Sequence, residues 1–219
     1  MQHPDIRDEI CRIGASLYAR GYVHASAGNI SVKLSDGSFL ITPTDACLGH
    51  LVASELAHVG IDGVQLSGAR ASKTLVLHRS IYEAAPQARC VIHTHATHLV
   101  SLTLQGVWRD TDIMPPITPY YVMKVGHIPL VAYQRPGSPT VATQVSQLIH
   151  KSVDQGTPIR GVMLDRLGPV VWHQSPAEAS AVLEELEETA KLWLMSERQA
   201  SALTDAQIQE LREAFGALW

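Results

Sequence analysis

The sequence predicts a single α/β domain, and three observations support that prediction. Helix-like and strand-like patterns mix from one end of the chain to the other, so neither an all-helical nor an all-β class fits. The 219 residues are 46% hydrophobic and 17% charged, which is enough apolar material for one sizeable core. No internal repeat, low-complexity stretch or linker-like change of composition divides residues 1–219, so we expect one domain over the whole chain.

The first half of the chain predicts a helix, a hairpin and a second helix. Apolar residues recur at helical spacing over residues 5–21, and Gly21 supplies a stop. The runs NISVKL and SFLITP alternate apolar and polar residues around the turn SDG, which predicts a β-hairpin. ELAHVGIDG predicts a further short strand and turn. Residues 73–85 place apolar side chains on one helical face, and Pro86 ends that helix.

The second half continues the mixture of helices and strands. CVIHTH predicts a strand and THLVSLTL a helix, followed by a strand-like IPLV and a helix over residues 138–152. GVMLDRL predicts a strand that turns through Gly168 into PVVW. A long helix then begins after Ser175, a natural N-cap with Glu178 completing a capping box. The same device over residues 204–207 begins a terminal helix.

Charge, hydropathy and cysteine content exclude several functional classes. A net charge of −4 and a pI near 6.2 leave no basic surplus for a nucleic-acid backbone. No apolar stretch approaches the roughly 20 residues that span a bilayer, and the N-terminus lacks a signal-peptide pattern, so we expect a cytoplasmic protein without a membrane partner. Cys11, Cys47 and Cys90 are widely spaced, which predicts small buried hydrophobic residues rather than disulfides or a thiolate metal site.

A histidine pair, His93 and His95, lies in the stretch CVIHTHATH directly after an apolar run. Alternate side chains of a strand share a face, with Cβ atoms roughly 6–7 Å apart, so two such imidazoles can converge on one cation. Histidines also end strands for hydrogen-bonding reasons, and the pair alone leaves both interpretations open. His98 is a weaker candidate because it falls in the predicted helix that follows.

Three polar clusters elsewhere in the chain predict an anion site. SAGNIS places Gly28 and Asn29 at the start of a strand, where backbone N–H groups and an amide can hold an anion. TPTD contributes Thr44, and ASK places Ser72 and Lys73 at the positive end of the following helix. Each cluster singly is ordinary turn or cap chemistry. Together they predict a phosphate pocket beside a metal.

The order SAGNIS, FLITPTD, ASK and VIHTHATH resembles the class II aldolase/adducin family over nearly the whole chain. The resemblance implies a three-layer fold, in which helices flank a central and mostly antiparallel β-sheet, and it implies a homotetramer. It also implies a divalent metal, Zn²⁺ or alternatively Mn²⁺, held by His93 and His95. The residues that it implies for phosphate binding are Gly28, Asn29, Thr44, Ser72 and Lys73.

Three further stretches, ITPYYVMKVG, YQRPGSPTV and LEELEETAKL, are similar to the 3-oxo-tetronate 4-phosphate decarboxylases. That similarity implies a metal-dependent carboxy-lyase that converts a small phosphorylated 3-oxo sugar acid to dihydroxyacetone phosphate and CO₂. Two alternatives remain open at this point. One is a class II aldolase acting on a sugar phosphate, and the other is a catalytically inactive member that binds or scaffolds.

Two positions depart from the family pattern. Thr74 stands where the aldolases have a catalytic glutamate, and Leu167 stands where the family has a third metal-binding histidine. Threonine cannot act as a carboxylate base near neutral pH, and leucine offers no lone pair to a cation. The loss at position 74 argues against aldol cleavage more than against decarboxylation, because a β-keto acid already carries its leaving group. Candidates for a replacement metal ligand are Asp165, His98 and His78.

The resemblance nominates Tyr120 as the proton donor, with Tyr121 as a rival if the local alignment shifts by one residue. Decarboxylation ends with protonation of an enediolate, so it needs such a donor. Aromatic packing at a subunit interface is the alternative interpretation of both tyrosines.

Overall fold

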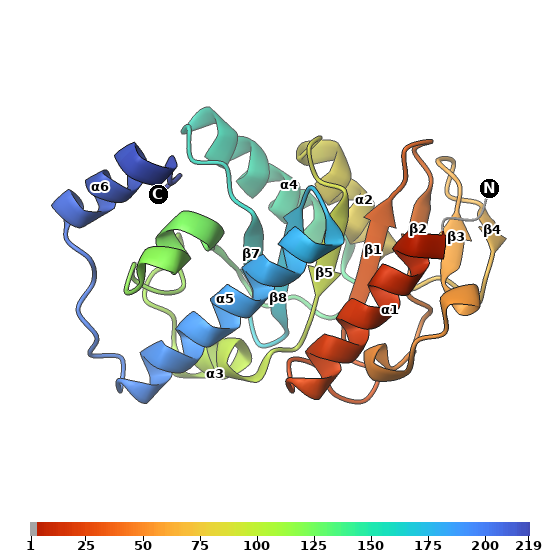
Figure 1. The fold of residues 1–219 in the computed structure, drawn as a ribbon, viewed down its shortest axis with the longest axis horizontal. Coiled ribbons are helices and arrows are strands. Elements are labelled where there is room, and N and C mark those ends of the chain that lie inside the picture. The colour runs from red at the N-terminus through yellow and green to blue at the C-terminus, as the bar shows by residue number, and fades with distance from the viewer. Residues whose placement is uncertain (1–3) are drawn as a thin grey trace.

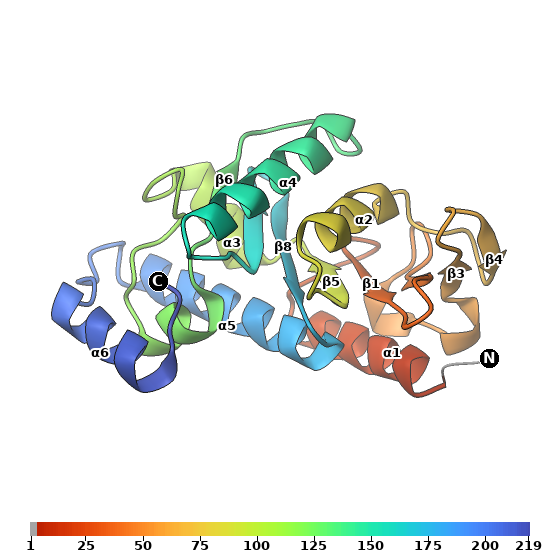
Figure 2. The same ribbon diagram turned by 90° about the horizontal axis from the view of Figure 1, so that it is seen from above.

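The computed structural model describes residues 4–219, in which a β-sheet lies between two layers of helices (Figures 1 and 2). In chain order, the elements are α1 (Pro4–Ala19), β1 (Asn29–Lys33), β2 (Phe39–Ile41), β3 (Ala57–Val59), β4 (Gln65–Ser67), α2 (Leu75–Ala84), β5 (Cys90–His93), α3 (Thr97–Gln105), β6 (Leu130–Val131), α4 (Pro139–Asp154), β7 (Gly161–Leu164), β8 (Gly168–His173), α5 (Pro176–Met195) and α6 (Asp205–Phe215). Short 3₁₀ turns cover Leu48–His50 and Ala53–Glu55, and a π-helical turn covers Tyr121–Val125.

The sheet has eight strands in the order β4-β3-β2-β1-β5-β8-β7-β6. Neighbouring strands are antiparallel except for β6 and β7, which are parallel. The three-layer arrangement and the mostly antiparallel sheet confirm the fold predicted from the sequence. β1 and β5 lie at the centre, with Asn29 opposite His93, so two of the predicted site residues are cross-strand neighbours.

Each face of the sheet is covered by its own helices and its own apolar cluster. Figure 2 shows α1 and α5 on one side of the sheet and α2 and α4 on the other. The cluster under α1, α3 and α5 includes Ile30, Ile92 and Leu183. The cluster under α2 and α4 includes Val91, Ile81 and Ile149. Adjacent residues of β5 therefore point to opposite layers, as the alternation of a strand requires.

The helix predictions hold, with shifted ends. Ser175 caps α5 by accepting a hydrogen bond from the Glu178 backbone N–H, and Thr204 and Gln207 form a complete capping box before α6. Glu178 does not complete the reciprocal half of its predicted box. Its carboxylate instead accepts from the hydroxyl of Ser175 and from Nδ1 of His173.

Two strand predictions were too long. The predicted strand CVIHTH ends at His93, because the chain must turn there to begin α3 at Thr97. GVMLDRL is strand only as far as Leu164, and a turn at residues 165–167 leads into β8. Gly168 permits this turn. Its φ is +141°, and a Cβ at this position would collide with the Thr94 carbonyl oxygen.

The remaining expectations from composition concern cysteines and membranes. Cys90 is buried, whereas Cys11 and Cys47 are only partly buried, and all three are free thiols. The prediction of buried small hydrophobes therefore holds fully for Cys90 alone. Among the helices of residues 4–219, none is long and apolar enough to cross a bilayer.

Candidate active site

A cavity of about 490 Å³ opens on the α2/α4 side of the sheet. Its walls are the N-terminal ends of α2 and α4, the loop of residues 132–138 before α4, and the ends of β5 and β7. His93 forms part of the wall, as do Thr44, Ser72 and Lys73. The fold thus brings one predicted metal ligand and three predicted phosphate ligands, from three separate stretches of the sequence, to one cavity.

His93 is buried at the end of β5 and presents one nitrogen with a free lone pair. Its Nδ1 lies 2.9 Å from the carbonyl oxygen of Pro169, which can only accept, so Nδ1 carries the proton. Nε2 is left as the basic atom. Burial and the neighbouring His95 lower the pKa of His93 to about 4, against a smaller opposing effect of the Pro169 carbonyl. The imidazole is therefore neutral at physiological pH, which is the form that binds metals.

His95 lies beyond the end of β5, so the prediction that both histidines belong to one strand was wrong. Their rings nevertheless lie close together, with centroids 5.1 Å apart. His95 is half-buried, and burial followed by the nearby His24 lowers its pKa. The ring of His24 is 6.3 Å from that of His95, so a third imidazole stands near the pair.

The histidine pair fits two positions of a metal site but does not complete one. Two imidazoles that share a tetrahedral ion have ring centres about 5 Å apart, which matches the observed spacing. Catalytic zinc sites usually have three protein ligands. Within residues 4–219, no group of three histidine, cysteine, aspartate or glutamate side chains is placed to hold an ion. A cation held here would therefore keep at least half of its coordination positions for water or substrate oxygens.

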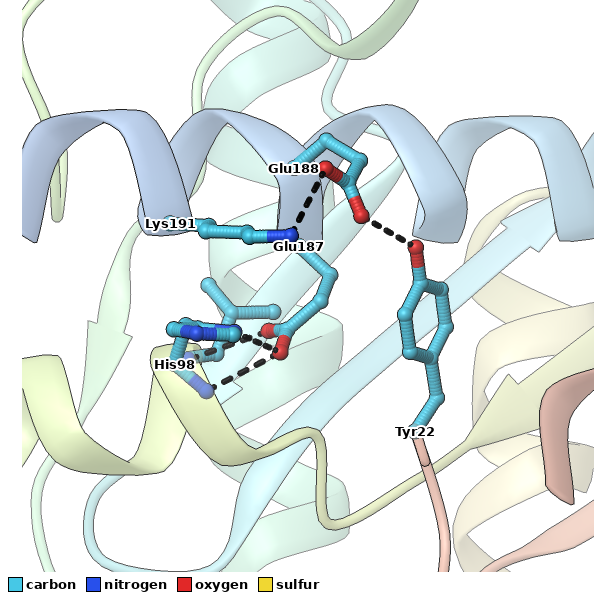
Figure 3. A network of polar contacts seen from close by, with 6 residues as sticks. Tyr22, His98, Glu187, Glu188 and Lys191 are labelled. Atoms are coloured by element: carbon cyan, nitrogen blue, oxygen red, sulfur yellow. Dashed lines mark hydrogen bonds and ion pairs between the residues drawn. The ribbon is translucent and has the colours of Figure 1, made fainter. Parts of the chain in front are cut away.

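His98, one of the candidates for a third ligand, is directed toward α5 (Figure 3). Its Nδ1 lies 2.7 Å from Oε1 of Glu187, and its backbone N–H donates to the same oxygen. The other carboxylate oxygen accepts from the Leu99 N–H. Glu187 thus caps α3 across 89 residues of sequence, and His98 helps to anchor that helix rather than lining the cavity.

His78, another candidate, is completely buried within α2. Tyr82 donates to the carbonyl of Ser31, so the Ser31 hydroxyl can donate to Tyr82 and accept from Nδ1 of His78 at 2.7 Å. Nε2 of His78 then carries a lone pair, and it has no hydrogen-bond partner. Burial, with a contribution from His93, lowers the pKa of His78 to about 3 and keeps this ring neutral.

Six buried side-chain polar atoms of the described residues lack hydrogen-bond partners, and three of them lie around His93. These three are Oδ1 of Asn29 on the paired strand, Oγ1 of the adjacent Thr94, and Nε2 of His78. A buried polar group without a partner costs about 1–3 kcal/mol, so such groups are rare in native structures. Their concentration here is the expected signature of a place where a ligand supplies the missing contacts.

The predicted phosphate residues form two groups. Thr44, Ser72 and Lys73 line the cavity, and Ser72 and Lys73 directly precede the N-terminal end of α2. Gly28 and Asn29 do not line it but adjoin His93, which does. Gly28 has a φ of +82°, and a Cβ there would lie 2.7 Å from the His93 carbonyl oxygen. Only glycine allows this close approach.

Both departures from the family pattern face the cavity. Thr74 lines it, with its hydroxyl 2.5 Å from that of Ser72. Leu167 and Asp165 line the wall contributed by the turn after β7. The leucine therefore presents an apolar surface where the resemblance expected a histidine. Asp165 is the one carboxylate among the described lining residues, and it makes a long ion pair of 3.9 Å with Arg166.

The two tyrosines nominated as proton donors lie outside the cavity walls. Tyr120 is 60% exposed, just before the π-helical turn. Tyr121 is fully buried and packs against Trp219, with ring centroids 5.4 Å apart. Within one chain, neither side chain reaches His93. Of the two, only Tyr120 is accessible from outside the molecule.

Sequence reasoning missed the loop of residues 132–138 as part of the site. This loop contributes Gln134, Arg135 and Ser138 to the cavity wall. Its stretch, YQRPGSPTV, is one of those that carry the similarity to the decarboxylases. A basic residue in a Pro-Gly turn directly before a helix is the signal that was available.

Comparisons with known proteins agree with this geometry. The profile of the Class II Aldolase and Adducin N-terminal domain matches residues 8–194. A 3-oxo-tetronate 4-phosphate decarboxylase from Cupriavidus necator is 56% identical over 98% of this chain and 97% of that protein. An L-fuculose phosphate aldolase from Methanocaldococcus jannaschii is 31% identical over 86% of this chain and 93% of that protein.

Solved structures of proteins with this fold are also similar to this chain. The crystal structure of YgbL from Escherichia coli has a TM-score of 0.87 and is 39% identical, covering 95% of this chain and 98% of that one. An L-fuculose 1-phosphate aldolase shares the fold, with a TM-score of 0.81 at 20% identity. The similarity to decarboxylases over nearly whole chains identifies an enzyme, a carbon–carbon lyase. The chain belongs to the class II aldolase and adducin family.

Proposed function

We propose that this enzyme decarboxylates 3-oxo-tetronate 4-phosphate, a phosphorylated 3-oxo sugar acid, to dihydroxyacetone phosphate and CO₂. The observation that carries the proposal is the composition of the cavity, in which Lys73 and two hydroxyl side chains lie together with His93 while Thr74 leaves no carboxylate at the base position. Relatives up to 56% identical that are named for this reaction support it.

Substrate binding begins at the N-terminal end of α2. Lys73 supplies a positive charge, and Thr44 and Ser72 supply hydroxyl donors on the same wall. This combination suits the dianionic phosphate of the substrate, and the helix N-terminus adds to it. Gly28 and Asn29, at the start of β1, are the other phosphate residues that the family resemblance implies, although they adjoin His93 and do not line the cavity. The sugar-acid carbons then extend from the Lys73 end of the cavity toward His93.

The chemical step needs no strong base. The C1–C2 bond breaks, CO₂ leaves, and the electron pair passes to the C3 carbonyl to give an enediolate. His93 and His95 would hold a divalent cation, zinc or manganese, whose chemistry here is to polarise the C3 carbonyl. Thr74 is compatible with this step because no proton has to be removed from carbon. An aldol reaction, in contrast, needs a base to move a proton, and Thr74 cannot serve as that base.

Protonation of the enediolate at C2 gives dihydroxyacetone phosphate. We nominate Tyr120 as the proton donor. Its 60% exposure fits a residue that acts on the cavity of a neighbouring subunit, since it does not line the cavity of its own chain. This assignment requires the homotetramer that the family resemblance implies. Tyr121 is the weaker nominee because its hydroxyl is enclosed by the surrounding structure.

A coupled assay tests the proposal. Metal-loaded protein is given enzymatically made 3-oxo-tetronate 4-phosphate, and dihydroxyacetone phosphate is measured through NADH consumption by glycerol-phosphate dehydrogenase. We expect a rate that chelator abolishes. His93→Ala should lower both the rate and bound metal by more than about 100-fold, because it removes one of two imidazole ligands.

The matched control is His150→Ala, which removes an exposed histidine of α4. It should match the wild type in rate and in metal content by inductively coupled plasma analysis. Release of an aldehyde from a sugar phosphate such as L-fuculose 1-phosphate, with no CO₂ from the 3-oxo acid, would favour a class II aldolase. No rate with zinc or manganese, in folded protein, would contradict the decarboxylase and favour the inactive binding member.

A further inference from the structure

The cavity carries two basic side chains on different walls. Lys73 stands just before α2, and Arg135 lies in the loop of residues 132–138 before α4. α2 and α4 pack against each other on one face of the sheet, so the two cations approach the cavity from two neighbouring helices. No other lysine or arginine is among the described residues that line it.

Neither cation is neutralised by the protein. Within residues 4–219, the side chains of Lys73 and Arg135 have no hydrogen-bond or ion-pair partner, and both residues are exposed to solvent. The one lining carboxylate, Asp165, is paired with Arg166 instead. Two uncompensated positive charges around one cavity favour a ligand with two anionic groups.

The two walls differ in the groups that surround each cation. Lys73 is accompanied by Ser72 and Thr44, a set of donors that suits a phosphate. Arg135 is accompanied by Gln134 and Ser138. A guanidinium is planar and can donate two parallel hydrogen bonds to a carboxylate, which a lysine cannot do.

We propose that Arg135 binds the C1 carboxylate of the substrate and thereby selects phosphorylated sugar acids over phosphorylated sugars. The inference rests on the function proposed above and adds the residue that distinguishes its substrate class. A sugar phosphate, the substrate of an aldolase, has no group to place on this wall. Arg135 is thus a specificity-determining residue.

The contact has a definite kinetic consequence. The carboxylate charge is greatest in the bound substrate and moves toward the C3 oxygen as CO₂ leaves. Arg135 therefore stabilises the ground state at least as much as the transition state. Its removal should raise KM and leave kcat unchanged or slightly higher.

The test compares two phosphate esters by isothermal titration calorimetry. 4-Phosphoerythronate has a phosphate and a carboxylate, whereas dihydroxyacetone phosphate has the phosphate alone. Arg135→Gln should weaken the first roughly 10- to 100-fold, the loss expected for a charge-assisted contact, and change the second less than about twofold. Lys73→Gln should weaken both esters. Arg135→Lys, which keeps the charge but not the planar fork, should give an intermediate loss.

The control is Lys151→Gln, which removes a positive charge near the other end of α4 and should change neither affinity. Equal weakening of both esters by Arg135→Gln would place Arg135 on the phosphate and overturn the inference, and so would no weakening of either. Wild-type protein that binds neither ester would overturn it as well. The predicted pattern without turnover in the coupled assay would instead reject the proposed reaction and retain the specificity of Arg135.

Discussion

Two sets of buried polar groups, one between α5 and α3 and one around His93, are satisfied to different degrees. On the α1/α5 side, the carboxylate of Glu187 is 2% exposed and accepts three hydrogen bonds from the start of α3. Around His93, at the end of β5, Asn29, His78 and Thr94 each retain a buried polar atom without a partner. In the first arrangement every carboxylate oxygen has a hydrogen-bond donor within the chain. In the second, we expect a bound ligand to supply the missing partners. In these two regions, the contact between α5 and α3 is satisfied within the chain, whereas the groups around His93 are not.

The largest expected effect is on stability, and the neighbouring residues Glu187 and Glu188 test it. Glu187→Ala leaves three donors at the start of α3 without their acceptor, so we expect a loss of about 3–5 kcal/mol in the free energy of unfolding. Glu188 is partly exposed and contacts Tyr22 and Lys191 (Figure 3). Glu188→Ala should cost less than about 1 kcal/mol. Urea unfolding measures both, and equal losses would contradict the structural role of Glu187.

An intermediate effect is expected from the pH dependence of stability. The folded His78 has a pKa of about 3, whereas an unfolded histidine titrates near 6.5. Between these values the unfolded state binds more protons, so stability falls as the pH falls. From pH 6.5 to pH 5, the wild type should lose about 1.5 kcal/mol more than His78→Gln. Urea unfolding at the two pH values measures this difference.

The exposed His150 is the matched control for that experiment. His150→Gln should follow the wild-type pH dependence. Parallel curves for the wild type and His78→Gln would show that the buried imidazole does not titrate as its surroundings require.

The smallest effect is expected when a metal-binding side chain is added to the cavity wall near His93. Leu167→His puts an imidazole on the cavity wall that His93 shares, at the position where the family has a histidine. We expect about tenfold tighter zinc binding, equivalent to about 1.4 kcal/mol. Competition with a fluorescent chelator measures it, with Leu66→His on the exposed strand β4 as the control. Unchanged affinity would mean that residue 167 does not approach the bound ion.

The layers of the fold were predictable because they depend on local patterns and on a resemblance that spans the chain. Ser175 and Thr204 marked helix starts correctly, since capping is a contact over three residues. The Glu187–His98 contact was not predictable, because it joins residues 89 apart and His98 had another plausible role as a ligand.

The candidate site was predictable in part. The motifs around Thr44, Ser72 and His93 meet at one cavity, as expected for residues that act together. Arg135 was missed because its stretch has ordinary loop chemistry, and only the packing of α4 beside α2 brings it to the cavity. The exposure of Tyr120 depends on tertiary structure and was not visible in the sequence.

Two adjacent residues at the turn between β7 and β8 differ in the substitutions that they tolerate. Gly168 cannot accept any side chain without moving β8 away from the end of β5, where His93 is attached. Leu167 lines the cavity and is half-buried at the edge of the apolar cluster under α2 and α4, and within residues 4–219 no backbone contact of this kind fixes its side chain. The turn can therefore exchange an apolar group for an ion-binding one at position 167 while Gly168 keeps the path of the backbone.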